Sequence, residues 1–140
     1  MASVRETAIG ALVTALEATG ATVWRDTDLT RDIPDAGMIN VSEADYQPEV
    51  ILSPLTFLHE MPAEVTATIV APSEPERDAA MDVLLLAISA ALTGDRTLGG
   101  AVEWLDVGVP GFIPFEANGA AKSARLPVTL CFTSAGSPLA

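Results

Sequence analysis

The stretch Asp95-Arg96-Thr97-Leu98-Gly99-Gly100 joins the longest apolar segment of this chain to a short strand pattern that contains Trp104. The apolar segment, at 83–92, has helical length and composition. Two consecutive glycines permit the positive φ angles that a sharp turn from a helix into a sheet requires. We therefore predict that Asp95, Leu98, Gly99 and Gly100 form a structural turn.

The helix before this turn has recognisable ends. Ser73-Glu74-Pro75-Glu76 is typical of a helix start, with proline in the first turn and acids at the positive end of the helix dipole. Gly94 is expected to end it. Because 83–92 is apolar on almost every side, we expect this helix to be covered on more than one face, within the subunit or by a neighbouring one.

The rest of the chain predicts one more helix and several strands. The capping box Ser3-Val4-Arg5-Glu6 starts a helix that ends near Gly20. Apolar runs and alternation predict strands at 21–25, 38–42, 64–71, 101–109 and 124–133. The prediction is a single α+β domain over 1–140, in which two helices pack on one face of a mostly antiparallel sheet.

Two prolines fall within strand patterns. Pro54 interrupts the segment 49–58, which indicates an edge strand or a bent, extended arm. Pro127 lies within 124–133 and indicates an edge position for that strand, because proline cannot donate a hydrogen bond to a neighbour.

The chain is strongly acidic. Its 140 residues include 19 acids and 7 bases, for a net charge of −12. This balance argues against a surface that grips nucleic acid, since phosphate contacts need clustered Lys and Arg. Two interpretations stay open: the charge maintains solubility, or it forms a wall past which DNA slides without binding.

Many of the acids gather between 26 and 49. In such a polar segment they are solvated, or they form a charged rim that faces a partner or a lumen. The candidates for a partner-facing or lumen-facing loop are Asp26, Asp28, Asp32, Asp35, Glu43 and Asp45. The calcium-loop pattern fails, because Arg31 occupies the glycine position.

No catalytic, cofactor or metal site is predicted. His59 is the only histidine and Cys131 the only cysteine, so a zinc site lacks ligands and an internal disulfide is excluded. We expect His59 at the surface or in an interface, and Cys131 in or near the core. Neither a signal peptide nor a membrane span is expected.

The layout resembles the tail terminator (tail completion) proteins of long-tailed bacteriophages and related gene transfer agents. The resemblance covers most of the chain, and its sharpest part is the turn at 95–100 with the helix before it and the strand at 102–105.

This resemblance implies a non-enzymatic virion protein, assembled in the host cytoplasm and located in the tail-neck region. It implies a homo-hexameric ring that caps the tail tube, ends tube polymerisation and docks a head-side connector or neck protein. DNA passes through the channel of such a ring without specific binding.

Two alternatives stay open at this point. One is another neck or head–tail joining protein of the same particle. The other is a small cytosolic α+β enzyme or ligand-binding domain with a pocket near Tyr46, His59 and Trp104.

Overall fold

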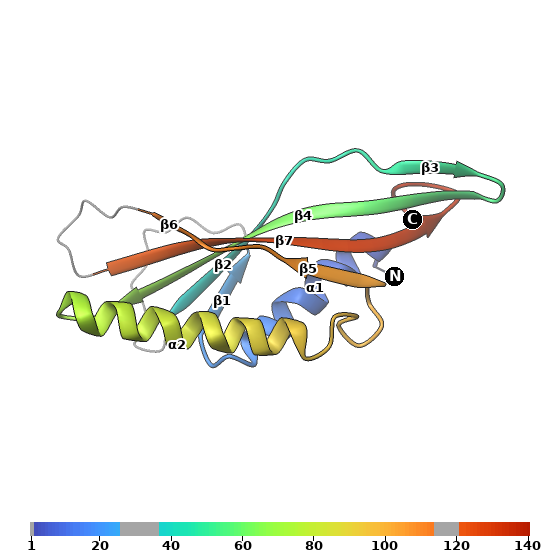
Figure 1. The fold of residues 1–140 in the computed structure, drawn as a ribbon. Coiled ribbons are helices and arrows are strands. Elements are labelled where there is room, and N and C mark those ends of the chain that lie inside the picture. Colours follow the sequence, from blue (N-terminus) through green and yellow to red (C-terminus); the bar gives the residue numbers. More distant parts are fainter. Residues whose placement is uncertain (1, 26–36, 114–120) are drawn as a thin grey trace.

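The computed structural model describes residues 2–25, 37–113 and 121–140 (Figure 1). These residues form an α+β fold, as the sequence predicts. The elements in chain order are α1 (Val4–Glu17), β1 (Thr22–Arg25), β2 (Met38–Glu43), β3 (Glu49–Leu52), β4 (Leu55–Val70), α2 (Glu74–Thr93), β5 (Trp104–Val107), β6 (Gly111–Ile113) and β7 (Ala121–Ala135).

The sheet is built on the long antiparallel pair β4 and β7. Their ladder runs from Thr56 opposite Ala135 to Val70 opposite Ala121. The strand order is β1-β2-β4-β7-β5, with β3 added to β4 and β6 added to β7. Only the pairing of β1 with β2 is parallel among the described strands, so the sheet is mostly antiparallel.

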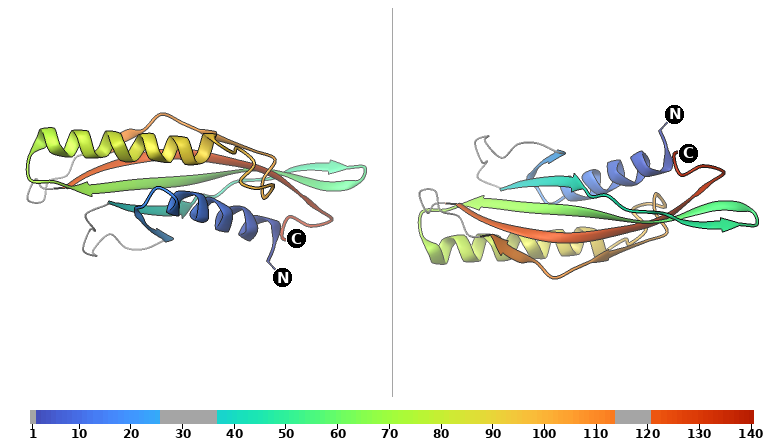
Figure 2. Two further views of the ribbon diagram at one scale, coloured as in Figure 1. Left: turned by 90° about the horizontal axis from the view of Figure 1, so that it is seen from below. Right: turned by 90° about the horizontal axis from the view of Figure 1, so that it is seen from above.

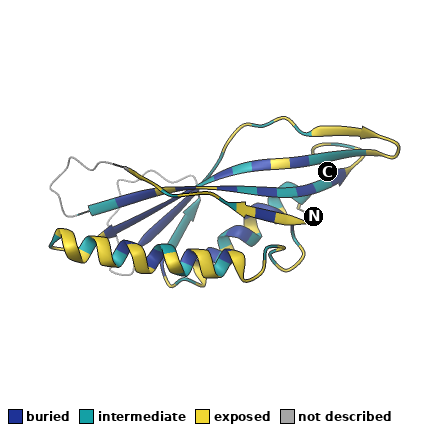
Figure 3. Ribbon diagram, viewed as in Figure 1, coloured by how far each residue is buried: buried dark blue, intermediate teal, exposed yellow. Residues whose placement is uncertain are grey.

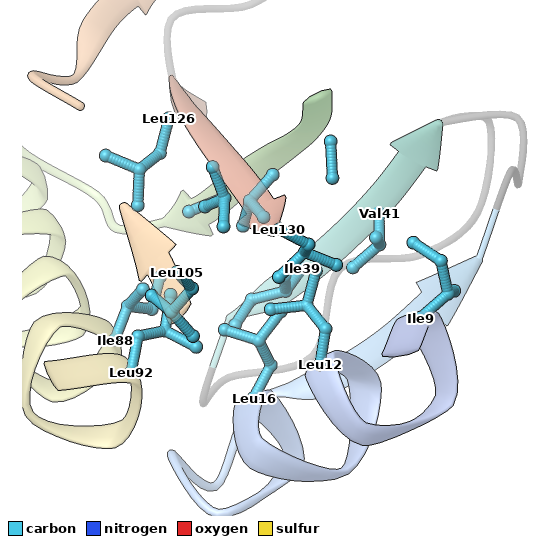
Figure 4. Close-up of a cluster of buried hydrophobic side chains, with 14 of the residues drawn as sticks. Ile9, Leu12, Leu16, Ile39, Val41, Ile88, Leu92, Leu105, Leu126 and Leu130 are labelled. Carbon is cyan, nitrogen blue, oxygen red and sulfur yellow. The ribbon is translucent and has the colours of Figure 1, made fainter. Parts of the chain in front are cut away.

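Both helices pack on the same face of this sheet. Buried apolar residues recur at every second position of β4 and β7, where Met61 lies opposite Leu130 and Val65 opposite Leu126. Leu12 and Leu16 of α1 and Ile88 and Leu92 of α2 complete the core, and these four belong to one cluster with the strand residues (Figure 4). Figure 2 shows both helices in front of the strands in the view from below.

The predicted helix ends are confirmed. The Ser3 hydroxyl accepts a hydrogen bond from the Glu6 amide, and the Ser73 hydroxyl accepts one from the Glu76 amide. Gly94 is the C-cap of α2.

The turn at 95–100 has the predicted role, and Asp95 organises it. Leu98, Gly99 and Gly100 all have positive φ angles, at 50°, 72° and 92°. Asp95 accepts hydrogen bonds from the Thr97 hydroxyl and amide through Oδ1, and from the Gly99 amide through Oδ2. Those bonds, the Thr97 hydroxyl first, lower the pKa of the Asp95 carboxyl. Leu98 packs against the core, which anchors the turn.

Pro54 lies in a turn. β3 and β4 form a hairpin whose turn contains the cis Ser53–Pro54 bond. The strand-like segment at 49–58 is therefore both arms of this hairpin, and β4 begins at Leu55, well before the predicted start at residue 64.

The prediction that Pro127 marks an edge strand is wrong. β7 lies between β4 and β5, inside the sheet. The Pro127 carbonyl accepts a hydrogen bond from the Gly108 amide at 2.8 Å. Since N and O of a strand residue point to the same side, its nitrogen faces the break between β5 and β6, where no ladder partner is required.

Replacement of Gly108 by alanine is expected to destabilise the fold. A Cβ at this position would lie 2.5 Å from Cγ of the rigid Pro127 ring. We expect Gly108→Ala to lower the free energy of unfolding by about 1–3 kcal/mol, measured by urea denaturation. Gly111→Ala is the control, because its Cβ would meet nothing within 4 Å; equal losses in both variants would contradict the proposed clash.

The charge of Asp95 is expected to stabilise the turn above about pH 4. Because the folded-state pKa is lowered, this contribution is complete above the unfolded pKa and disappears as pH falls through the folded one. Asp95→Asn should lower Tm at pH 7, by an amount that shrinks on acidification. Asp45→Asn is the control: its exposed side chain lies outside this turn, so the substitution should leave Tm unchanged. A Tm difference for Asp95→Asn that stays constant to the lowest pH would contradict this role.

Candidate assembly surfaces

The predicted acidic loop falls partly within the described structure. Asp26, Asp28, Asp32 and Asp35 lie outside the described residues. Glu43 is the last residue of β2, and Asp45 follows it with an exposed side chain.

Glu43 has partners within its own subunit. Its Oε1 lies 2.7 Å from Nη1 of Arg5 and 3.2 Å from Nη2 of Arg25. Arg25 also binds Glu6 at 2.5 Å, and this hydrogen bond is the main cause that raises the pKa of Arg25 and lowers that of Glu6. The cluster joins α1 to β1 and β2, so Glu43 helps to hold the first helix on the sheet.

His59 is buried, and its predicted surface or interface position is wrong. Only 1% of its surface is exposed, and its ring stacks on Phe132 at a centroid distance of 4.6 Å. Nδ1 lies 2.5 Å from the Tyr46 hydroxyl, and Nε2 lies 2.8 Å from Oγ of Ser134. Burial lowers the pKa of His59 and raises that of Tyr46.

The contact between His59 and Ser134 does not form a nucleophile–base pair. The Ser134 hydroxyl donates its hydrogen to the Ser137 carbonyl at 2.8 Å, so Nε2–H of His59 donates to Ser134 and Nδ1 accepts from Tyr46. A catalytic serine needs its hydrogen directed to the base and an open approach for substrate. This buried group is therefore a satisfied hydrogen-bond network of the core.

The suggested pocket near Tyr46, His59 and Trp104 is not assembled. His59 lies opposite Phe132 on β7, whereas Trp104 lies opposite Cys131, the preceding residue. Successive strand residues point to opposite faces of a sheet, so Trp104 is on the face away from the helices. There its ring lies 4.9 Å from the Arg96 guanidinium carbon.

Cys131 shares this open face and is half-buried, rather than part of the core. Burial, together with the nearby carboxylates of Glu60, Asp106 and Glu103, raises the pKa of its thiol. A thiol with a raised pKa is a poor nucleophile at neutral pH.

The most exposed apolar strand surface is the β3–β4 hairpin, residues 49–58, which we call the arm. It extends beyond the ends of both helices (Figure 1). Its exposed side chains are Val50, Ile51, Leu52 and Leu55, and Leu52 is 80% exposed. Exposed apolar residues on an edge strand are typical of a surface that pairs with another chain.

A second apolar surface is the outer side of α2. Val83 is 67% exposed and Leu86 is 63% exposed (Figure 3 shows the exposed stripe along α2). Leu84, Ile88 and Leu92 are buried on the opposite side. Within the described subunit, α2 is thus covered on one side only, although its sequence predicts coverage on more than one. We define the outer α2 face by Ala79, Val83, Leu86 and Ala90.

The described residues provide neither a membrane helix nor a metal cluster. Neither α1 nor α2 has the length and hydropathy needed to cross a bilayer. Within 2–25, 37–113 and 121–140, no three His, Cys, Asp or Glu side chains are grouped so that they could hold a metal ion.

Comparison with known proteins finds a similarity of fold. No protein-family model matches the chain, and no curated protein matches it in sequence. A solved structure, described as "Virion of native gene transfer agent (GTA) particle", contains a chain that matches with a TM-score of 0.50. The match covers 94% of this chain and 92% of that chain at 18% identity, so the two share a fold.

Burial of His59 is expected to make stability depend on pH near neutrality. The lowered folded-state pKa means that unfolding takes up a proton, so stability should fall as pH decreases from about 7.5 to 5.5, by at most about 1.4 kcal/mol per pH unit. His59 is the only histidine, so His59→Gln should remove most of this slope. Denaturant unfolding across this range measures it; an equal slope in wild type and His59→Gln would contradict a neutral, buried His59.

Proposed function

We propose that this chain is a structural, non-enzymatic virion protein of the bacteriophage and gene transfer agent type, and that it acts as a tail terminator. The observation that carries the proposal is the shared fold with a chain of a gene transfer agent virion, over nearly the full length of both. The predicted turn at Asp95–Gly100 and its neighbouring elements support the finer assignment to tail termination.

In this role the chain forms a homo-hexameric ring in the tail-neck region of the virion, after synthesis in the host cytoplasm. One side of the ring binds the tail tube protein and stops its polymerisation. The other side binds a head-side connector or neck protein. The arm and the outer α2 face, both apolar and left exposed by the described residues, fit a protein that functions inside an assembly.

The charge of the chain suits a DNA channel. With a net charge of −12, a ring wall repels the phosphate backbone and lets DNA pass without specific contacts. Asp45, together with Asp26, Asp28, Asp32 and Asp35, is a candidate for this wall or for a partner-facing rim. Glu43 contributes less to it, because Arg5 and Arg25 neutralise its charge.

The second candidate is another neck or head–tail joining protein of the same particle. It has the same virion setting and the same need for apolar contact surfaces. The two candidates differ in the partner that the ring recognises, which is the growing end of the tail tube for a terminator.

Polymerisation of the tail tube protein in the presence of this chain tests the proposed terminator role. The purified chain, added to its own tail tube protein during polymerisation, should shorten the tubes in proportion to its concentration and leave ring density at one end in electron micrographs. Leu52→Asp and Leu86→Asp should lose this effect, and Leu139→Asp, at an 84% exposed position in the C-terminal tail, should retain it. Unchanged tube lengths and bare ends would contradict termination; binding to the connector alone would favour the neck candidate.

A further inference from the structure

The arm carries one ionisable side chain, the exposed Glu49 at its base, which points to the face opposite Val50. No ionisable side chain lies between residues 50 and 58, although the chain has a net charge of −12. The register pairs Val50 with Phe57 and Leu52 with Leu55. These four apolar side chains therefore share one face of the hairpin, the face directed to the helix side of the sheet.

The outer α2 face is free of charge from residue 83 onward, and the exposed Asp82 borders it at its N-terminal end. No ionisable side chain occurs from residue 83 to residue 93. Hollows flank the helix on both sides. One, of about 370 Å³, is lined by Ile69, Ala80 and Val83 among others, and one of about 270 Å³ is lined by residues that include Leu85 and Val107. The helix thus offers an apolar ridge between two shallow grooves.

Charge determines which surfaces of two copies can meet. Subunits with twelve excess negative charges repel one another, so close contact is least costly where neither surface carries charge. Residues 50–58 of the arm and the outer α2 face from residue 83 onward both satisfy this condition. They match each other electrostatically, since an uncharged apolar ridge leaves no buried ion unpaired against an uncharged apolar hairpin.

A third exposed apolar segment, with Val109 and Phe112, is less suitable. The Lys122 ammonium lies 4.7 Å from the centroid of the Phe112 ring. The cavity of about 390 Å³ beside it is lined by Glu64 and Arg125, which form an ion pair at 2.7 Å. An apolar arm placed there would remove these charges from water without replacing their contacts.

We propose that the apolar face of the arm, formed by Val50, Leu52, Leu55 and Phe57, docks on the outer α2 face of a second copy of this chain. The arm extends away from the helices of its own subunit (Figures 1 and 2), so an α2 on which it docks must belong to another copy. Because the two surfaces differ, the contact is head-to-tail, and such contacts generate rings when the rotation closes. Closure into the ring rests on the proposed function; the contact itself does not.

Two variants that each remove one side of the contact test the proposal. Leu52→Asp places a charge on the arm, and Leu86→Asp places one on the outer α2 face. Both positions are largely exposed, so both variants should keep the wild-type circular dichroism and Tm. In sedimentation velocity, each variant alone should associate at least about tenfold more weakly than wild type, while Leu139→Asp should associate as wild type does.

A mixture of the two variants gives the decisive result. In a head-to-tail contact, the intact arm of Leu86→Asp can dock on the intact α2 of Leu52→Asp, so an equimolar mixture should form dimers and nothing larger. The wild type should associate more strongly as salt increases, because salt screens the repulsion and the contact contains no ion pair.

Three results would overturn the proposal. The first is a mixture that stays monomeric. The second is dimerisation of either variant alone to the wild-type extent, which would indicate an arm–arm or α2–α2 contact. The third is a wild type that stays monomeric up to its solubility limit. Because no tail tube protein is present, these results are independent of the tube-capping experiment. Head-to-tail association without tube capping would refute the terminator role and leave the contact intact.

Discussion

The whole architecture depends on the antiparallel pairing of β4 with β7. This ladder joins Thr56–Val70 to Ala121–Ala135, and α2 is inserted between the two strands in the chain. Along one part of its length, the buried face of this ladder supports both helices. The ladder then continues past the helices and carries β3, so the same pairing builds the core and projects the arm. The turn at Asp95–Gly100 is what returns the chain from α2 to the sheet beside β7.

Local signals in the sequence were sufficient for the helices, their caps and this turn, because each depends on neighbouring residues alone. Ser73, Gly94 and the Gly99–Gly100 pair act through hydrogen bonds and φ angles within a few positions. The predictions for Pro127 and His59 are wrong, because the environments of both residues come from distant parts of the chain. The missing N–H of Pro127 is tolerated only where Gly108 breaks the neighbouring strand, and His59 is buried only because Tyr46 and Ser134 satisfy both ring nitrogens.

The candidate surfaces likewise include one that local sequence indicates and others that depend on distant residues. The apolar composition of 83–92 indicated that more than one side of α2 needs cover, and the structure identifies Val83 and Leu86 as the residues left uncovered. The sequence indicates the arm only as a strand-like segment around Pro54, since the exposure of the arm follows from the extra length of β4 and β7. Glu43 shows the opposite case: an acid suggested for a lumen or partner is held by Arg5 and Arg25, which lie far from it in sequence.

We propose that this subunit works as part of a ring at the end of a tail tube. Solution mass by light scattering, with electron micrographs of the same sample, tests it most directly, first for the chain alone and then with its own tail tubes. We expect particles of fixed stoichiometry, six copies in a ring, in free form or on tube ends. A chain that remains monomeric both alone and with tail tubes would contradict the claim.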